Sequence, residues 1–298
     1  MEMNSDSIGR RDFLKQSAVM SLMAGVAGAA APEPTPAPGV LKKALQLGML
    51  PGKLSDADKF KMASDCGFSG IEGGPMSDLD AAKKLGELAQ AAGTPIHSIV
   101  YGGWDAPLSD PDPAVIEKGL IGMKNALRSA KALGAETVLL VPVVVNAKAT
   151  SAEAWERSHK HIPQLLPLAE ELKVVIAIEE VWNNFLLDSA DDFARYIDEF
   201  KSPWVKAYFD VGNVVAYGLP QDWIRTLGKR IVKVHLKDFK KKGKEWVNLR
   251  DGDVNWLEVR KAFDEVGYNG FITTELPGGD EAYLRDLSQR IDLIIAGK

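Results

Sequence analysis

Short apolar runs alternate with longer amphipathic segments along most of the chain. The short runs, such as "KVVIAIEE", are rich in Val and Ile, which is typical of strands buried on both faces. The longer segments repeat their apolar positions every three or four residues, which is typical of amphipathic helices. The expected strands are Ala44–Leu50, Gly70–Gly73, Pro95–Val100, Thr137–Val144, Val174–Glu179, Val205–Val211, Ile231–Lys237 and Phe271–Leu276. The expected helices are Ser55–Cys66, Ser77–Ala92, Pro113–Leu133, Ala152–Leu172, Ala190–Phe200, Pro220–Gly228, Asn255–Val266 and Asp280–Ile295.

This alternation of strand and helix occurs eight times, which is the count of a single-domain (β/α)8 TIM barrel. Glycine follows several helical segments, in "CGFSG", "AAGTP", "ALGAE" and "EVGYNG", where it favours the end of a helix. An open doubly wound sheet is the alternative, but "QLGMLPGKL" after the first strand lacks the Gly-x-Gly-x-x-Gly pattern of a phosphate-binding loop. We therefore expect an α/β barrel over residues 40–298.

The first 39 residues differ in composition from the rest of the chain. Arg10 and Arg11 precede "DFLK", a short apolar run, two Ala-x-Ala sites and a proline-rich stretch. This is the layout of a secretory signal, and the paired arginines resemble the twin-arginine export signal. We therefore expect residues 1–39 to be a twin-arginine signal peptide with a proline-rich linker, and the mature protein to be periplasmic or secreted. The alternative is an amphipathic N-terminal helix on a cytoplasmic protein.

Charge and cysteine content narrow the range of functions. The net charge of −5 offers no overall basic field to nucleic acid or to an anionic lipid surface. The apolar run near the N-terminus is too short and too rich in glycine for stable insertion into a membrane. Cys66 is the single cysteine, so an intrachain disulfide and a thiolate zinc cluster are excluded. Since the chain has only four histidines, a metal site would rely on carboxylates.

Polar residues lie at the ends of several expected strands, where barrel enzymes place their chemistry. The fifth to eighth strands each end with a potential metal ligand: Glu179, Asp210, His235 and Glu275. Three carboxylates and one imidazole suit one divalent ion, for which we expect Mn²⁺, with Mg²⁺, Co²⁺ or Zn²⁺ as alternatives. Any one of these acids could instead cap a helix or form a salt bridge. Their occurrence on four successive strands favours the metal site.

Two adjacent acids, Glu179 and Glu180, end the fifth strand, and only one of them can face the interior of the barrel. Alternation groups Ala177 with Glu179, and it groups the bulkier Ile176 and Ile178 with Glu180. The bulkier set suits the layer between strands and helices, and the smaller set suits the crowded barrel interior. We therefore expect Glu179 to be the ligand and Glu180 to anchor a neighbouring residue.

The segments "IAIEEVWNNFLL", "YFDVGNVVAYG", "VKVHLKDF" and "TTELPGG" occur in this order along the chain. Together they resemble the xylose isomerase-like barrel superfamily of sugar (phosphate) isomerases and epimerases, over roughly Leu45–Ile295. The resemblance implies one divalent metal ion held by the four strand-end residues named above. It also implies that Glu179 and Glu275 form an acid–base pair.

Substrate contacts are expected from Glu72, His97, Trp104, Asn183, Asn213 and Lys237. Asn213 departs from the family, because several members have histidine three residues after the sixth-strand Asp. Its neutral amide can bind a hydroxyl but cannot carry a proton. Lys237 begins the lysine-rich loop "KDFKKKGKEW", which is either a clamp for phosphate or carboxylate or a solvated loop. A lone histidine such as His97 is more commonly structural.

These observations predict a metal-dependent sugar isomerase or epimerase that acts on a ketose-like or keto-polyol substrate through a cis-enediolate. One glutamate removes a proton, and the other returns one to the opposite face of the same carbon or to the neighbouring carbon. One alternative is a metal-dependent lyase that deglycosylates 3-keto-glycosides and releases the aglycone. Another is a non-catalytic sugar-binding barrel, which would exchange no solvent deuterium into a ketose. An endonuclease is disfavoured because its multinuclear zinc site needs more histidines. The expected partner is a small-molecule sugar, and homo-oligomerisation is left open.

Overall fold

The computed structural model describes residues 39–145, 148–181 and 189–298, and the barrel lies in the compact unit that comprises residues 36–298. Eight strands close into a barrel in the order β1-β10-β7-β6-β5-β4-β3-β2, and every pairing between neighbours is parallel. The strands are β1 (Leu41–Gln46), β2 (Gly70–Gly73), β3 (Ile96–Gly102), β4 (Thr137–Leu140), β5 (Val175–Glu179), β6 (Val205–Asp210), β7 (Ile231–Leu236) and β10 (Gly270–Thr274). The predicted (β/α)8 TIM barrel is confirmed.

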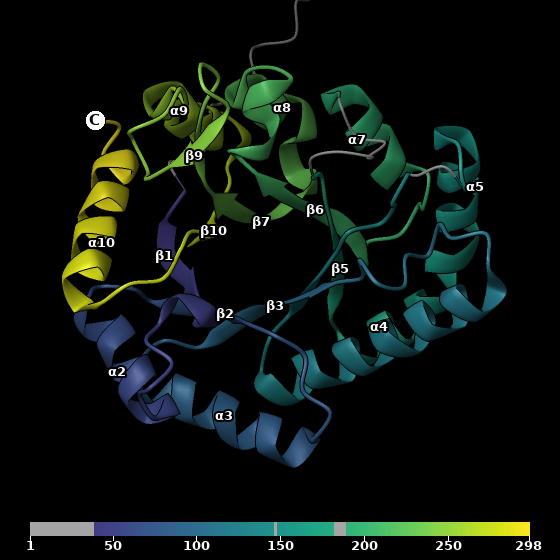
Figure 1. Cartoon of the computed structure of the whole chain (residues 1–298), viewed down its shortest axis with the longest axis horizontal. Helices are drawn as coiled ribbons and strands as arrows, with labels where there is room; N and C mark the ends of the chain where they lie inside the picture. The colour runs from purple at the N-terminus through teal and green to yellow at the C-terminus, as the bar shows by residue number, and fades with distance from the viewer. Residues whose placement is uncertain (1–38, 146–147, 182–188) are drawn as a thin grey trace, which may run out of the picture. The chain divides into compact units, whose positions relative to one another are not determined.

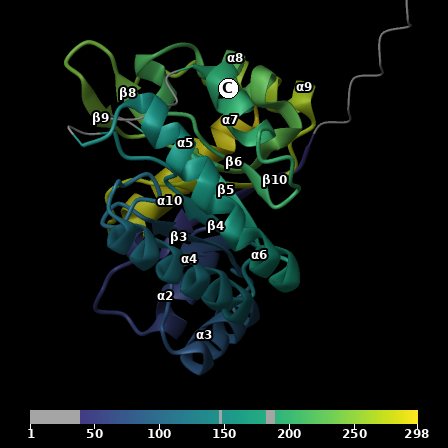
Figure 2. The same cartoon turned by 90° about the vertical axis from the view of Figure 1, so that its right-hand side faces the viewer.

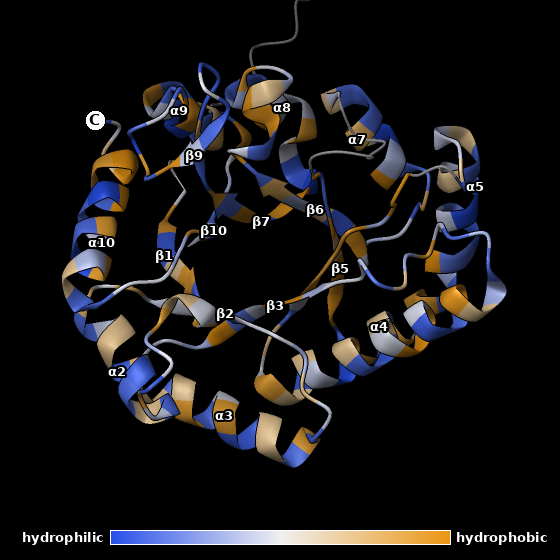
Figure 3. Cartoon of the chain, viewed as in Figure 1, coloured by the Kyte–Doolittle hydropathy of each residue, from blue (hydrophilic) through white to orange (hydrophobic). Residues whose placement is uncertain are grey.

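Helices surround the ring of strands (Figure 1). They are α2 (Asp56–Asp65), α3 (Leu79–Ala91), α4 (Pro113–Leu133), α5 (Ser151–His161), α6 (Leu166–Leu172), α7 (Ala190–Asp198), α8 (Pro220–Leu227), α9 (Trp256–Val266) and α10 (Glu281–Ile295). Hydrophobic residues follow the strands and alternate with hydrophilic ones along the helices, as Figure 3 shows. In the part of the chain that the structure describes, no helix has both the length and the apolar character needed to cross a bilayer.

Local sequence signals set the ends of the helices, and α4 shows how. Pro113 occupies the first turn, where its missing N–H costs nothing, and the Asp112 side chain accepts a hydrogen bond from the Ala114 N–H. Gly134 ends the helix with a φ of 82°, a left-handed conformation that glycine adopts without a steric penalty. The predicted bounds of this helix, Pro113–Leu133, therefore agree with the structure.

Most predicted bounds agree with the structure within two residues, and three predicted elements differ from it by more. The first strand begins at Leu41 rather than Ala44, because the charged Lys43 fits in a strand when its ammonium pairs with Asp292 of α10 at 2.7 Å. β4 ends at Leu140 rather than at residue 144, since Pro142 has no N–H for the ladder. The predicted helix over residues 152–172 is divided into α5, the 3-10 turn η2 (Ile162–Leu165) and α6, with prolines at the start of the last two segments.

An antiparallel hairpin that the sequence did not predict follows β7. Its strands are β8 (Asp238–Lys240) and β9 (Glu245–Val247), in which Phe239 lies opposite Trp246. In Figure 2 the hairpin lies at the upper left. It is formed by the lysine-rich loop, so that loop has a defined conformation beside the carboxyl end of β7.

The barrel has two hydrophobic layers. Ile176 and Ile178 of β5 belong to the large core that also contains the buried faces of the helices. Ala177 belongs to a smaller cluster with Leu139 and Tyr208, formed by strand residues. The predicted alternation along β5 is therefore confirmed, and it directs Glu179 toward the barrel interior.

Candidate metal centre

Four side chains from neighbouring strands meet at the carboxyl end of the barrel. Glu179 ends β5, Asp210 ends β6, His235 lies near the end of β7, and Glu275 directly follows β10. One potential ligand atom from each residue lies within 4.8 Å of the others. Because β5, β6, β7 and β10 are adjacent in the barrel, residues at the same level on them must come together. The structure thus brings together the four ligands that the sequence predicts.

The imidazole of His235 lies between carboxylates on both of its nitrogen sides. Nδ1 is 2.8 Å from Oε1 of Glu179 and 3.2 Å from Oε2 of Glu275. Nε2 is 2.7 Å from Oε2 of Glu72. Burial alone would lower the pKa of His235, but the negative charges of Glu72 and Glu275 hold this pKa well above its ordinary value. Since Nε2 is engaged by Glu72, Nδ1 is the nitrogen that faces the other ligands.

Glu72 holds His235 from below and is itself held by three other donors. Its Oε1 accepts hydrogen bonds from the hydroxyls of Ser98 and Tyr208, and its Oε2 accepts from Gln46 Nε2 at 3.1 Å as well as from His235. Its exposed fraction is 1%. Burial raises the pKa of Glu72, yet His235 and the other donors bring it below the ordinary value. Glu72 therefore positions the imidazole, and its predicted contact with the substrate stays a prediction.

Asp210 is fixed by backbone groups that leave one of its oxygens directed at the other ligands. Its Oδ1 accepts hydrogen bonds from the N–H groups of Gly212 at 2.8 Å and Asn213 at 3.1 Å. Its own N–H donates to Oε1 of Glu180 at 2.7 Å, and the Asn213 amide donates to the Glu180 carbonyl at 2.8 Å. Glu180 thus holds the end of β6, the anchoring role that we expected for it.

Lys237 brings a positive charge into the same group. Its Nζ lies 2.9 Å from Oδ2 of Asp210 and 2.8 Å from Oε2 of Glu275, and it lies 5.1 Å from the ring centroid of Trp246. Gly212 allows this approach, because a Cβ at that position would lie 2.6 Å from Cβ of Lys237. The turn after β6 therefore packs directly against the lysine.

The residues present fit a divalent cation. Oδ2 of Asp210 and Oε2 of Glu275 are buried, and both form ion pairs with Lys237. Among the described residues, neither oxygen accepts a hydrogen bond of normal geometry. Buried carboxylate oxygens of this kind are costly unless a cation or a donor satisfies them. Three carboxylates and one imidazole are also a donor set that hard and borderline divalent ions accept. The cluster has the composition and compactness of a single-ion site.

The two glutamates differ in their affinity for protons. Burial raises the pKa of Glu179 to about 7, and the charge of Glu275 acts in the same direction against the lowering effect of His235. Burial would also raise the pKa of Glu275, but His235 and Lys237 outweigh it and hold this pKa below its ordinary value. Glu275 is therefore the more strongly ionised of the pair.

A pocket of about 320 Å³ opens above these residues. Its apolar wall is formed by Val100, Leu139, Val141 and Val181. Trp104 and Trp246, which are 53% and 45% exposed, lie on it as well. Glu179, His235, Glu275, Asn213 and Lys237 supply its polar groups. Apolar faces combined with a few grouped polar side chains are what a small-molecule site requires, and indole faces suit the C–H face of a sugar ring.

The predicted substrate-contact residues other than Glu72 divide into three groups. Trp104, Asn213 and Lys237 line the pocket. Asn183 lies in the segment 182–188, outside the described residues. His97 is 4% exposed and stacks on Phe271 with ring centroids 4.1 Å apart, and burial lowers its pKa well below the ordinary value. His97 is therefore a neutral histidine of the barrel interior, and its predicted contact with the substrate stays a prediction.

Several residues of the site were missed from the sequence. Gln46, Ser98 and Tyr208 hold Glu72, and Trp246 lies beside Lys237 on the unpredicted hairpin. Gln46 is a polar residue at the end of β1, so the strand-end rule would have found it if the bounds of that strand had been right. No local signal distinguishes Ser98 or Tyr208, because their role depends on a carboxylate that reaches them across the barrel.

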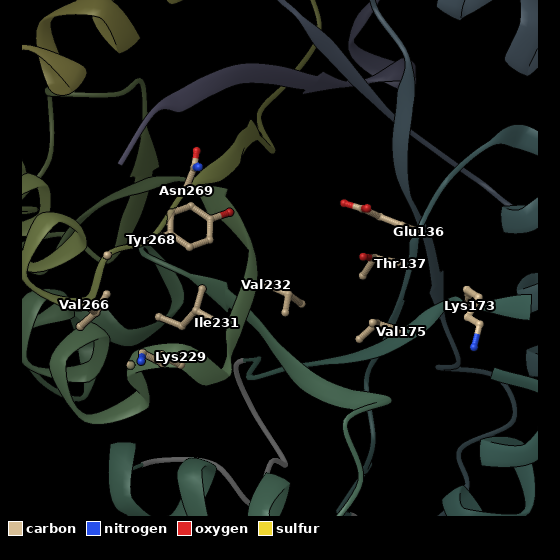
Figure 4. A pocket seen from close by; sticks show the side chains of 12 residues that line it. Glu136, Thr137, Lys173, Val175, Lys229, Ile231, Val232, Val266, Tyr268 and Asn269 are labelled. Carbon is tan, nitrogen blue, oxygen red and sulfur yellow. The ribbon is translucent and has the colours of Figure 1, made fainter. Parts of the chain in front are cut away.

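A second cavity, of about 480 Å³, lies at the opposite end of the barrel (Figure 4). Glu136, Val175, Ile231 and Asn269, which line it, lie at or just before the first residues of β4, β5, β7 and β10. The Glu136 carboxylate is paired with Lys233 at 2.7 Å. The cluster of potential metal ligands among the described residues lies at the other end, where the strands terminate, so we assign the active site to that end and not to this cavity.

Comparison with known proteins gives a consistent set of relatives. SgbU of Escherichia coli K12, provisionally named an L-ribulose-5-phosphate 3-epimerase, is 26% identical over 259 residues, which cover 80% of this chain and 87% of SgbU. The L-ribulose-5-phosphate 3-epimerase UlaE of Escherichia coli O1:K1 is 27% identical over 188 residues, 60% of this chain and 66% of UlaE. This second match thus spans slightly less than two thirds of the relative.

Solved structures and a family comparison agree with the fold. The crystal structure of a D-psicose 3-epimerase in the presence of D-fructose superposes with a TM-score of 0.72 at 16% identity, covering 86% of this chain and all of the other. The family described as "Xylose isomerase-like TIM barrel" matches residues 60–292. That match spans most of the barrel, from within α2 to within α10. The chain therefore belongs to the xylose isomerase-like TIM barrel family.

Proposed function

We propose that the protein is a divalent-metal-dependent sugar epimerase or isomerase that acts on a ketose-like substrate. The observation that carries this proposal is the meeting of four ligand atoms within 4.8 Å at the base of a pocket at the carboxyl end of the barrel. The names of UlaE, an L-ribulose-5-phosphate 3-epimerase, and of SgbU, provisionally named as one, support an enzyme of the isomerase and epimerase class. Fold similarity to a D-psicose 3-epimerase is consistent with it.

The ion would be held by the four residues of the candidate metal centre, and Mn²⁺ suits their mixture of carboxylates and imidazole. When bound, such an ion polarises a substrate carbonyl and makes the neighbouring C–H more acidic. Glu72 keeps the His235 ring oriented with Nδ1 toward the site. Glu180 keeps the end of β6 in place through the backbone of Asp210. Supporting contacts of this kind commonly decide metal affinity.

Proton transfer falls to Glu179 and Glu275. They come from β5 and from the end of β10, which are separated in the barrel by β6 and β7, so they reach the pocket from different strands. One carboxylate takes the proton from the carbon beside the carbonyl, and the electron pair delocalises to give the enediolate. The other returns a proton. Return to the opposite face of the same carbon gives the epimer, and return to the neighbouring carbon gives the isomer.

The rest of the pocket would orient the sugar. The indole faces of Trp104 and Trp246 offer apolar contact to a sugar ring or chain. Asn213 cannot transfer a proton, and its amide N–H already binds the Glu180 carbonyl, so we assign it to the wall of the pocket rather than to the chemistry. Lys237 supplies a positive charge to the pocket.

The experiment that tests this function is solvent exchange in D₂O. The Mn²⁺-loaded protein is incubated with a panel of free and phosphorylated ketoses, and NMR follows deuterium at the carbon beside the carbonyl together with the appearance of the epimer. Glu275→Gln should slow exchange by about 10²–10⁴-fold, which is the usual contribution of a general acid or base. Glu281→Gln, at an exposed position on α10, is the control and should leave the rate unchanged.

Two outcomes would contradict the proposal. Binding of Mn²⁺ without exchange into any ketose would indicate a non-catalytic sugar-binding barrel. Release of an aglycone from a 3-keto-glycoside, without formation of an epimer, would indicate the lyase.

For residues 1–39 we propose twin-arginine export to the periplasm. Arg10 and Arg11, the apolar run and the Ala-x-Ala sites support this assignment. Fractionation of cells that express the full chain should find it in the periplasm, and replacement of both arginines by lysine should retain it in the cytoplasm. Equal distribution of the two proteins would contradict the assignment.

A further inference from the structure

The ammonium of Lys237 occupies the position of a cation in the candidate metal centre. Its Nζ contacts Oδ2 of Asp210 at 2.9 Å and Oε2 of Glu275 at 2.8 Å. Both oxygens are buried, and neither accepts a hydrogen bond of normal geometry from the described residues. A divalent ion held by the same carboxylates would therefore need oxygens that the lysine already neutralises.

Among the described residues, two carboxylates are the ion-pair partners of the Lys237 ammonium. Its side chain is 17% exposed, and its backbone is packed against Gly212 in the turn after β6. The direction open to it is the pocket, which it lines together with Trp246. Two positive charges a few ångströms apart in a poorly solvated site repel each other strongly. Either the ammonium turns into the pocket when the ion binds, or it stays and weakens the ion's attachment.

We propose that Lys237 is an internal competitor of the metal ion: it stabilises the metal-free protein by neutralising Asp210 and Glu275, and it thereby lowers the affinity of the site for the ion. This inference rests on the proposed metal centre and goes beyond it. Without Lys237, the carboxylates of the site would face His235 as their one nearby cation among the described residues. Lys237 therefore has opposite effects on two properties: it increases the stability of the metal-free chain, and it decreases the affinity for the metal ion.

The opposite reading is that Lys237 orients the two carboxylates for the ion, as supporting residues of metal sites usually do. It predicts a change of the opposite sign, because loss of an orienting contact weakens metal binding. The sign of the change in affinity after removal of the ammonium therefore decides between competition and orientation.

The test uses the full chain, Mn²⁺ alone and isothermal titration calorimetry. Lys237→Met keeps much of the length of the side chain and removes its charge. Its affinity for Mn²⁺ should rise about tenfold or more, since a single charge at this distance shifts such equilibria by one or more powers of ten. Differential scanning calorimetry should show that the metal-free variant melts below the wild type. Mn²⁺ should then raise its Tm by more than it raises that of the wild type, because tighter binding to the folded state adds more stability.

Two further variants serve as controls. Lys242→Met removes one positive charge from the exposed turn of the hairpin and should leave Mn²⁺ affinity unchanged. Lys237→Arg keeps a cation between the carboxylates and should bind Mn²⁺ within about threefold of the wild type, which is small beside the shift that a full charge causes. A Lys237→Met chain that folds only when Mn²⁺ is present would support the proposal, since it shows the predicted loss of stability without metal.

Unchanged or weaker Mn²⁺ binding by Lys237→Met, with the wild type binding normally, would overturn the competition and leave the metal centre standing. Tighter binding by Lys237→Arg, equal to that of the methionine variant, would show that charge is not the cause. Absence of Mn²⁺ binding by the wild type would overturn the metal centre itself, and this inference with it.

Discussion

Glu72→Gln is the substitution that most directly tests how the site is built. Glu72 is buried beneath the imidazole of His235 and receives four hydrogen bonds, from Gln46, Ser98, Tyr208 and His235. Glutamine has almost the same shape, so packing is preserved while the negative charge is lost. Its amide oxygen can still accept from Nε2 of His235, and the two hydroxyls can rotate to accept from its NH₂ group. The variant therefore isolates the effect of charge beneath the imidazole.

The magnitude follows from the place of this carboxylate in the proposed metal centre. It lies 2.7 Å from Nε2, on the far side of the ring from the ligand atom Nδ1, which is 2.8 Å from Glu179. A carboxylate in that position increases the basicity of the coordinating nitrogen and fixes the ring. Its loss typically costs 10- to 100-fold in metal affinity, or about 1.4–2.7 kcal/mol. We expect Mn²⁺ affinity to fall by that factor.

The assay is calorimetric titration with Mn²⁺ at pH 7, accompanied by a thermal unfolding curve of each metal-free protein. Glu136→Gln is the control, because Glu136 also pairs with a cation, Lys233, but lies at the opposite end of the barrel. The control should bind Mn²⁺ as the wild type does. If Glu72→Gln is folded and binds Mn²⁺ within twofold of the wild type, the reasoning about the imidazole is refuted.

Three further predictions concern the scaffold. The buried carboxylate of Asp238 accepts hydrogen bonds from three backbone N–H groups in the region after β7, and Asp238→Asn weakens them. Each bond lost costs about 1 kcal/mol, so calorimetry should show a Tm lower by about 2–4 °C per bond. An unchanged Tm would contradict this role. Gly212→Ala places a Cβ 2.6 Å from Cβ of Lys237, and this overpacking should lower the Tm of the metal-free protein in scanning calorimetry. Gly48→Ala, where a Cβ meets nothing within 4 Å, should not lower the Tm, and equal effects of the two variants would refute the packing argument. The hydrogen bond and charge of Arg230 lower the pKa of Asp198 in the folded state. The ion pair therefore stabilises the folded protein by less than about 1 kcal/mol at pH values above the unfolded-state pKa of about 3.9, and this stabilisation is lost as the pH falls through the folded-state pKa. Urea unfolding should therefore show a difference between wild type and Asp198→Asn at pH 7 that narrows as the pH falls below about 3.9, and a difference that does not narrow would contradict the pairing.

Most of the secondary structure could be predicted because its signals are local. In β5, the alternation of Ile176, Ala177 and Ile178 predicted both the strand and the layer that each side chain enters. The predictions failed where a local signal was outweighed by a distant partner. Lys43 lies within β1 because Asp292, 249 positions further along the chain, pairs with it across the packed layer of α10. The prolines that divide α5 from α6 are a local signal, and this division is therefore visible in the sequence.

The sequence by itself determined the fold and the four residues of the candidate metal centre. Strands repeated eight times form a closed parallel barrel, and residues that end adjacent strands of such a barrel meet at one end. Only the tertiary structure decided what surrounds them. Glu72 and His235 are 163 positions apart, and Lys237 finds Asp210 through a turn that glycine allows to pack closely. Such contacts depend on side-chain lengths and directions across the barrel interior, which no periodicity along the chain records.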